Sequence, residues 1–206
     1  MNKYIVRSID ESEAQDVVDF KNVHYHNQTP LEMAVGGFHS SDNTEMIKDA
    51  IKNGFVLKVI ESGSSLMVGL VIGHKMEPPS TDKVENLHKL SQISQLLAFV
   101  EDKAKIFEKY EDQRQIRIRS LCVHSERRGC GIGKLLFDAG IAEAKRQNYD
   151  LLTVNCSNAY SARIAAGMNF ELVTTVQFQD FNDHVGSQVF KPVEPHTVIK
   201  TYALRL

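Results

Sequence analysis

Three glycines fall within five residues at 129–133, where a β-rich run gives way to an amphipathic one. Glycine tolerates the positive φ angles at which a backbone curls with its N–H groups inward, and a helix start adds unpaired N–H groups and a positive dipole. Arg128 and Lys134 flank these glycines with positive charge. The spacing predicts a phosphate cradle, although such a turn can also serve only to tighten a join between a strand and a helix.

Two better-known phosphate loops do not fit these residues. The Walker A loop has four residues between its first glycine and its Gly-Lys pair, followed by Ser or Thr. Here three residues separate Gly129 from Gly133, and Leu135 follows Lys134. The dinucleotide fingerprint has a small residue where Lys134 stands and an acidic residue at the end of the next strand, where Cys156 stands. The turn therefore belongs to neither class.

The strand expected before this turn changes its pattern part of the way along. Ile116 and Ile118 lie on one parity of the period-two alternation. Leu121 and Val123 lie on the other parity, so the pattern slips by one residue near Ser120. A β-bulge produces such a slip and leaves backbone groups available to something other than the neighbouring strand. A ragged strand end is the alternative interpretation.

Together these features resemble the acetyl-CoA site of the GNAT superfamily of N-acetyltransferases. The motif of that family is Val, four residues, Arg or Gln, two residues and Gly-x-Gly, and it is matched by Val123, Arg128, Gly131 and Gly133. The resemblance implies acetyl-CoA as cosubstrate, a bulged fourth strand that pairs with its pantetheine arm, and a turn that holds its pyrophosphate. Leu121 and Val123 would then bond pantetheine, and an amide near Cys122 would polarise the thioester carbonyl. The implied phosphate-binding residues are Arg128, Gly129, Cys130, Gly131, Ile132, Gly133 and Lys134.

A narrower resemblance covers residues 155–170 (NCSNAYSARIAAGMNF), which are similar to the second motif of the insect and nematode arylalkylamine N-acetyltransferases, including the dopamine-acetylating type. It implies catalytic roles as relay and proton donor for Ser157 and Ser161, and places Asn158 and Ser161 beside the cofactor. Ala165 stands where the wider superfamily often has a tyrosine donor. The two serines would share a face if both lay on the first helical turn. Alternatively, Ser157 or Asn158 only caps that helix.

The resemblance does not assign the residue that acts as general base. The insect enzymes have a glutamate just before Pro-Leu in the loop after the first helix, and Thr29 stands there in this chain. Glu32 is the leading candidate to replace it. His24 and His26 have a side chain of suitable unperturbed pKa, ~6.5, and Asp180 is expected near the substrate end of the sheet. A water chain is a further alternative.

The elements that must position these residues follow from hydrophobic periodicity. Strands are expected at residues 4–9, 55–61, 66–76, 115–124, 151–156, 171–178 and 197–206. Helices are expected at residues 11–24, 43–52, 82–110, 132–147 and 159–168. This order predicts an α/β (α+β) fold, with a GNAT-type mixed central sheet of about seven strands, flanking helices and a bulged fourth strand.

Composition narrows the function further. The chain has 206 residues, expected to form one N-acetyltransferase domain (residues 1–206), and its formal net charge of −2 gives no basic footprint for nucleic acid. Three cysteines without a Cys-x-x-Cys pair argue against a disulfide framework and a metal site. The longest apolar run, 66–73, is far short of a membrane span, and we expect a cytoplasmic protein.

The expected function is transfer of an acetyl group from acetyl-CoA to a primary amine, by direct attack in a ternary complex. An arylalkylamine is the leading acceptor, and a polyamine, an amino acid or another small amine is the alternative. The alternative from a different class is a non-catalytic acyl-CoA-binding module. We expect a monomer or a homodimer, without a nucleic acid or membrane partner.

Overall fold

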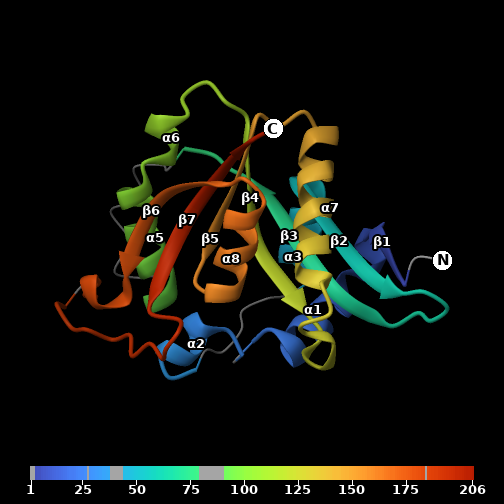
Figure 1. Cartoon of the computed structure of the whole chain (residues 1–206), viewed down its shortest axis with the longest axis horizontal. Helices are drawn as coiled ribbons and strands as arrows, with labels where there is room; N and C mark the ends of the chain where they lie inside the picture. The colour runs from blue at the N-terminus through green and yellow to red at the C-terminus, as the bar shows by residue number, and fades with distance from the viewer. Residues whose placement is uncertain (1–2, 27, 38–43, 79–90, 184) are drawn as a thin grey trace.

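The computed structural model describes residues 3–26, 28–37, 44–78, 91–183 and 185–206. Its strands form one seven-stranded sheet in the order β1-β2-β3-β4-β5-β7-β6 (Figure 1). The strands are β1 Tyr4–Ser8, β2 Gly54–Glu61, β3 Met67–Lys75, β4 Gln115–Val123, β5 Leu151–Cys156, β6 Glu171–Gln177 and β7 Val198–Arg205. Every neighbouring pair is antiparallel except β4 and β5. The predicted mixed sheet is confirmed.

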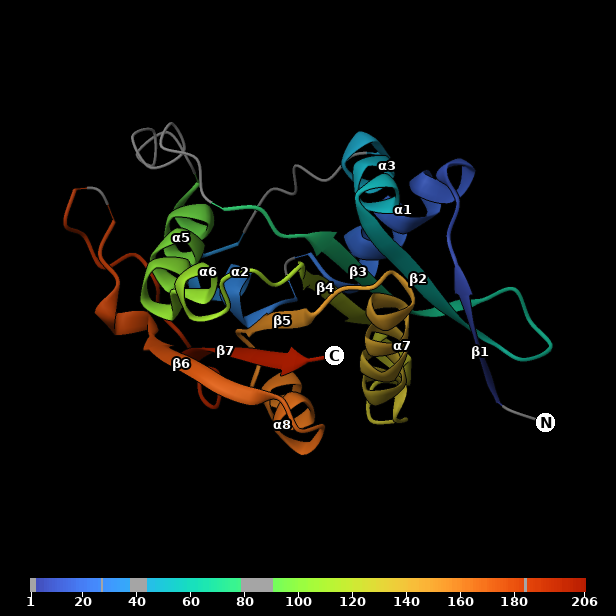
Figure 2. The ribbon, with the colours of Figure 1, turned by 90° about the horizontal axis from the view of Figure 1, so that it is seen from above.

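Helices cover both faces of the sheet. They are α1 Ala14–His24, α2 Pro30–Ala34, α3 Thr44–Lys52, α5 Gln92–Ala104, α6 Ile106–Lys109, α7 Ile132–Arg146 and α8 Ala159–Gly167. Figure 2 shows α7 and α8 on one face and α1, α3, α5 and α6 on the other. Within the described ranges, no helix has the length and the apolar character that a membrane crossing requires.

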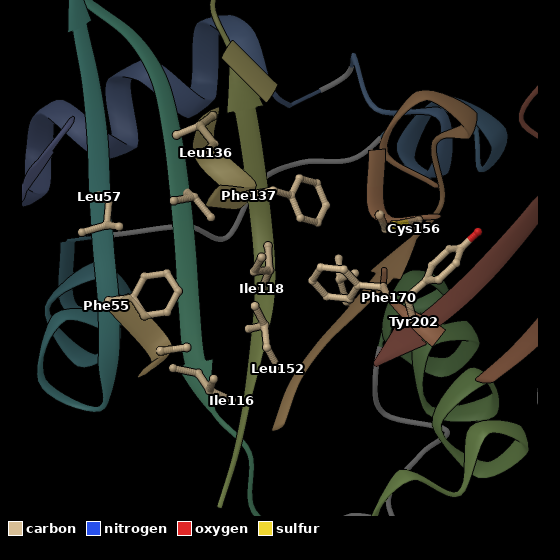
Figure 3. Packing of buried hydrophobic residues seen from close by; sticks show 14 of the residues in the cluster. Phe55, Leu57, Ile116, Ile118, Leu136, Phe137, Leu152, Cys156, Phe170 and Tyr202 are labelled. Atoms are coloured by element: carbon tan, nitrogen blue, oxygen red, sulfur yellow. The ribbon is translucent and has the colours of Figure 1, made fainter. Parts of the chain in front are cut away.

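The largest core lies between the sheet and the two helices α7 and α8 (Figure 3). Phe137 of α7 packs edge-on against Phe170, with ring centroids 5.8 Å apart, and both side chains are buried. The strands add Phe55, Leu57, Ile116, Ile118, Leu152 and Tyr202 to this cluster. Separate apolar clusters lie under α1 with α3, and between α2 and α5. Because both faces are covered, the inner strands are buried on both sides.

The predicted slip in β4 is a bulge. Opposite β3, Ile72 pairs with Ser120 and Gly73 pairs with Ile118, so Arg119 is the extra residue. The bulge places Leu121 and Val123 against the same core cluster as Ile116 and Ile118, which explains the change of parity. The alternative of a ragged strand end is wrong, because β4 continues to Val123 and stays paired with β3.

Pairing between β4 and β5 ends early. Their last paired residues are Ile118 and Val154, while β5 continues beside β7 as far as Cys156. Figures 1 and 3 show the two strands diverging toward their carboxyl ends. Among the described residues, no strand pairs with the backbone of β4 beyond the bulge on its β5 side.

The long helix expected at 82–110 is wrong as a single element. Its first residues, up to 90, lie outside the described residues, and Ser91 caps a helix that begins at Gln92. That helix ends at Ala104, because Lys105 adopts a left-handed conformation with φ of 49° before α6 begins. The apolar repeat continues through the break, so periodicity alone gave no sign of it.

Two differences concern the N-terminal helices. The helix expected at residues 11–24 is preceded by a short 3-10 turn at Glu11–Glu13, which Asp10 caps, so α1 begins only at Ala14. The segment around Pro30 was expected to be a loop, but it contains α2, with Pro30 in its first turn and Thr29 as its N-cap. Proline is well suited to this position because its missing N–H is not needed there.

Candidate active site

The predicted phosphate cradle is the turn at residues 129–133, which is open because of the conformation of its glycines. Gly129 and Gly131 have φ angles of 80° and 81°, and a Cβ atom on either would meet no atom within 4 Å. Gly131 is the N-cap of α7, and among the described residues no side chain bonds the free N–H groups of this helix start. Open space, unpaired N–H groups and the helix dipole together fit a large anion such as a pyrophosphate.

Other members of the turn have different roles. Ile132 is buried in the core, so only its backbone can face the turn, while Cys130 is exposed. A Cβ atom on Gly133 would lie 3.1 Å from Cδ1 of Ile164, which indicates that this glycine lets α7 and α8 pack closely. Lys134 extends along α7 to Asp138, with Nζ 2.9 Å from the carboxylate.

Arg128 does not point freely into the turn. Its guanidinium donates to the carbonyl oxygen of His24, at 3.0 Å, and to Oε1 of Gln28, at 2.7 Å. These bonds tie the loop between α1 and α2 to the glycine turn. Sequence reasoning missed this contact because the residues are about a hundred positions apart.

The free edge of β4 fits an extended ligand arm. Leu121 and Val123 turn their side chains toward the α7 core, and Cys122 is buried on the opposite face. Burial raises the pKa of the Cys122 thiol to about 12, which keeps this thiol neutral and unreactive. What β4 offers on its β5 side is therefore backbone, which is suited to pairing with an amide-containing chain.

The first turn of α8 departs from the predicted arrangement. Asn158 caps this helix, with its Oδ1 accepting from the N–H of Tyr160 at 2.8 Å. Ser157 precedes the cap, so it does not lie on the first helical turn, and the condition under which Ser157 and Ser161 would share a helical face is not met. Ser161 lies on the first turn and donates to the carbonyl oxygen of Asn158 at 2.8 Å. Ala165 is fully buried and offers no proton donor.

Ser161 also lies close to the thiol of Cys156. Burial raises the pKa of Cys156 to about 11, and hydrogen bonding with the Ser161 hydroxyl partly opposes this effect. Cys156 is thus another neutral, structural thiol.

Two of the candidate bases form a pair. Nδ1 of His26 lies 2.9 Å from Oε1 of Glu32, and both residues are buried. Thr29 occupies the N-cap of α2, where its Oγ1 accepts from the N–H of Glu32 at 3.2 Å. The cap fixes the first turn of α2 and with it the position of Glu32. A buried carboxylate that orients an imidazole is a common arrangement for proton transfer.

The other two candidates lie elsewhere. The ring of His24 stacks on that of His124 with centroids 4.0 Å apart, beside the glycine turn. Burial, followed by the positive charge of its neighbours His124 and Arg128, lowers the pKa of His24. Asp180 accepts from the N–H of Gln177 at 3.3 Å and closes a 3-10 turn after β6.

Sequence reasoning also missed a buried polar cluster at the point where β4 and β5 separate. Arg117 is only 9% exposed and forms a two-pronged ion pair with Glu101 of α5. An arginine between Ile116 and Ile118, inside an apolar strand, is the one signal that could have indicated it. Lys21 of α1 is a second buried cation on this face, 3.4 Å from Oγ of Ser120 in the bulge.

Comparison with known proteins identifies the class. Residues 80–186 match the acetyltransferase (GNAT) domain, and the chain belongs to this family. It is accordingly an N-acetyltransferase, and GNAT acetyltransferases use acetyl-CoA. In the part of the chain that the structure describes, no group of three His, Cys, Asp or Glu residues could hold a metal ion.

Solved structures of insect enzymes share the fold at low identity. A mosquito arylalkylamine N-acetyltransferase-like protein 5b superposes with a TM-score of 0.87 at 21% identity, over 98% of this chain and 100% of that one. A Drosophila melanogaster polyamine N-acetyltransferase that forms N-acetylagmatine has a TM-score of 0.81 at 23% identity, over 98% and 100%. Arylalkylamine N-acetyltransferase 2 from Aedes aegypti has a TM-score of 0.83 at 18% identity, over 99% of each chain.

Proposed function

We propose that this enzyme acetylates a small primary amine, with an arylalkylamine as the preferred acceptor, in a ternary complex with acetyl-CoA. The observation that carries the proposal is the free edge of β4 beside an open glycine turn. All seven strands belong to one sheet, so residues 1–206 would act as a single domain. Cys122 and Cys156 are buried free thiols and Cys130 is an exposed one, which suits the reducing conditions of the cytoplasm.

The glycine turn and β4 would orient the cosubstrate. The N–H groups of residues 129–133 would bind the pyrophosphate, and the backbone of Leu121 and Val123 would pair with the pantetheine arm. The amide near Cys122 would donate a hydrogen bond to the thioester carbonyl. That bond strengthens as negative charge develops on the oxygen during attack.

The His26–Glu32 pair would accept the proton of the amine. An alkylamine with a pKa of ~10 is mostly protonated near neutral pH and cannot attack until it loses that proton. The bonds from Arg128 to His24 and Gln28 hold the α1–α2 loop against the glycine turn. His26 belongs to that loop, and Glu32 lies in the first turn of α2. In this assignment Glu32 orients and stabilises the imidazole, and His26 takes the proton.

Departure of the thiolate requires less help. A thiol of pKa ~8.5 is a good leaving group, so a weak acid suffices to protonate it. Ser161 is the donor that we assign, since it lies on the first turn of α8. Ser157, which precedes the cap, would relay a proton through solvent.

The charges around the opening favour an arylalkylamine over a polyamine. Lys21 and Arg117 are buried cations on this face, while Glu32 and Glu101 already bond to His26 and Arg117. The second ammonium group of a polyamine would need a carboxylate that is not already paired with a protein cation or imidazole. An aromatic ring could instead contact Phe99, which is half-buried at the edge of a cluster with Phe181, Phe178 and Phe190. The polyamine alternative is supported by the fold shared with the Drosophila enzyme.

An acceptor panel tests the proposal. The protein would be incubated with acetyl-CoA and with tyramine, dopamine, tryptamine, spermidine, agmatine or thialysine, and the release of free thiol would be followed. We expect the highest kcat/KM with an arylalkylamine. A preference for spermidine or agmatine would favour the polyamine alternative. Tight binding of coenzyme A without thiol release from any amine would mean a non-catalytic acyl-CoA-binding module.

A further inference from the structure

A partly buried polar cluster joins four elements on the sheet face opposite α7 and α8. We name the cluster the strand clip and define it as Glu101 of α5, Arg117 of β4, Thr153 and Asn155 of β5, and Thr201 of β7. Arg117 donates through both terminal nitrogens to the Glu101 carboxylate and through Nε to Oγ1 of Thr153, at 3.1 Å. Nδ2 of Asn155 donates to Glu101 at 2.8 Å, and Oγ1 of Thr201 donates to Oδ1 of Asn155 at 2.9 Å. Each strand next to the opening is thus tied to α5.

The clip lies at the point where the sheet opens. Arg117 and Thr153 are paired neighbours, and the next pair, Ile118 with Val154, is the last between β4 and β5. One residue further, Arg119 forms the bulge, and β4 leaves β5. The strand clip therefore lies around the last paired residues of β4 and β5, just before the gap between these two strands.

An ion pair at this place fixes geometry more than it adds stability. The Arg117 side chain is 10% exposed and that of Glu101 is 32% exposed, so the arginine loses most of its water and the carboxylate part of it. An apolar contact would hold the strands together at a smaller desolvation cost. A guanidinium that binds both oxygens of a carboxylate permits one orientation of the two groups, unlike an apolar contact that can slide. Thr153 and Thr201 are fully buried, so the cluster has little room to rearrange.

We propose that the strand clip sets the separation of β4 and β5 and so fits the gap to the pantetheine arm of the cosubstrate. Its members are positioning residues that act through the two strands. The inference rests on the proposed function, because it takes this gap as the site of the arm. It predicts that removing a bond of the strand clip weakens binding of the pantetheine arm and leaves the affinity of the glycine turn for the nucleotide unchanged.

Binding of two ligands to the full chain separates these effects. Coenzyme A spans the turn and the gap, whereas its phosphorylated ADP half, without the pantetheine arm, contacts the turn alone. For Glu101→Gln, we expect the Kd of coenzyme A, measured by calorimetry, to rise about tenfold, since a small misplacement of a binding group is costly. The Kd of the ADP half should stay within about twofold of the wild-type value.

Two further variants keep the test decisive. Glu13→Gln removes a partly buried ion pair with Lys58, far from the gap, and should leave both Kd values unchanged. Thr201→Val removes one clip bond with little change of shape, and serves if Glu101→Gln does not fold; it should weaken coenzyme A binding alone, by a smaller factor. An equal rise of the Kd for both ligands in the clip variants, or no rise for either, would overturn the positioning role. Failure of the wild-type chain to bind either ligand would instead overturn the proposed function.

Discussion

The glycine turn and the α1–α2 loop lie against each other, but they are held in place differently. The turn owes its shape to its own backbone, with Gly129 and Gly131 at positive φ and α7 starting directly after them. The loop is held by side chains from elsewhere in the sequence, among them Arg128 on Gln28. Local sequence therefore specifies the cosubstrate end of the site, whereas tertiary contacts assemble the acceptor end.

This difference determines how each end should respond to substitution. A change at the glycines of the turn should affect acetyl-CoA and spare the amine, because Gly129 and Gly131 set the backbone shape of the turn locally. A change at the acceptor end should alter proton transfer or amine binding and leave the KM of acetyl-CoA unaltered.

The largest effect is expected from the His26–Glu32 pair. For Glu32→Gln we expect kcat at neutral pH to fall about a hundredfold, because a positioned general base contributes at least that much. The loss should shrink as pH rises toward ~10, since the amine then deprotonates in solution. Rates from pH 6 to pH 10 with saturating tyramine or dopamine would measure this.

A matched control for this variant is Glu45→Gln, which alters an exposed carboxylate paired with Lys48 on α3. The KM of acetyl-CoA should be unchanged in both variants. A pH profile for Glu32→Gln that runs parallel to the wild type would mean that the amine proton leaves through water.

The second effect tests the turn. In Gly131→Val the new Cβ meets no atom within 4 Å, but a β-branched residue is strained at a φ of 81° by roughly 1–3 kcal/mol. If the turn relaxes to relieve that strain, its N–H groups move, and the KM of acetyl-CoA should rise about thirtyfold. Initial rates with each substrate varied in turn would give this value for Gly131→Val.

The β2–β3 hairpin offers a control with the same backbone strain. Gly63 has a φ of 82° and open space around it, so Gly63→Val should cost similar stability without changing either KM. An amine KM that rises together with the acetyl-CoA KM in Gly131→Val would remove the distinction between the two ends.

These differences explain what the sequence could predict. The bulge at Arg119 and the turn at Gly131 were predictable because each leaves a local signature, a change of parity in one case and a fixed glycine spacing in the other. The mixed sheet with its parallel β4–β5 pair follows from the order of strands and helices, but the place of β7 between β5 and β6 does not.

The local sequence does not indicate which residues pair with Glu32 and Arg117. His26 and Glu32 were separate candidates in the sequence, and only the fold of α2 joins them. Lys105 ended α5 through a left-handed residue that the apolar repeat does not reveal. Burial of a charged side chain depends on partners distant in the sequence, which periodicity cannot identify.

A third prediction uses the reactivity of the cysteines to test whether the glycine turn binds the phosphates of acetyl-CoA. Burial raises the pKa of Cys122 to about 12 and that of Cys156 to about 11, which keeps both thiols protonated at pH 8, whereas Cys130 is exposed within the turn. Iodoacetamide should therefore modify Cys130 alone in the native protein, as mass spectrometry would measure. Acetyl-CoA at ten times its Kd should slow this modification about tenfold.

The control here is Cys130→Ser, which should remain active and take up no label. Labelling of Cys130 at the same rate with and without acetyl-CoA would contradict the assignment of the turn as the phosphate site.

The smallest effect is expected at Thr29, where the insect enzymes carry a glutamate. Because Thr29 caps α2, Thr29→Glu should cost about 1 kcal/mol of the free energy of unfolding and lower the Tm by about 2–4 °C. It should change kcat by less than about twofold, since the His26–Glu32 pair already supplies the base. Thr29→Ser, which keeps the cap, should match the wild type in both measurements. A several-fold rise of kcat in Thr29→Glu would instead mean that this enzyme works without a strong base and that the buried pair serves the fold of α2.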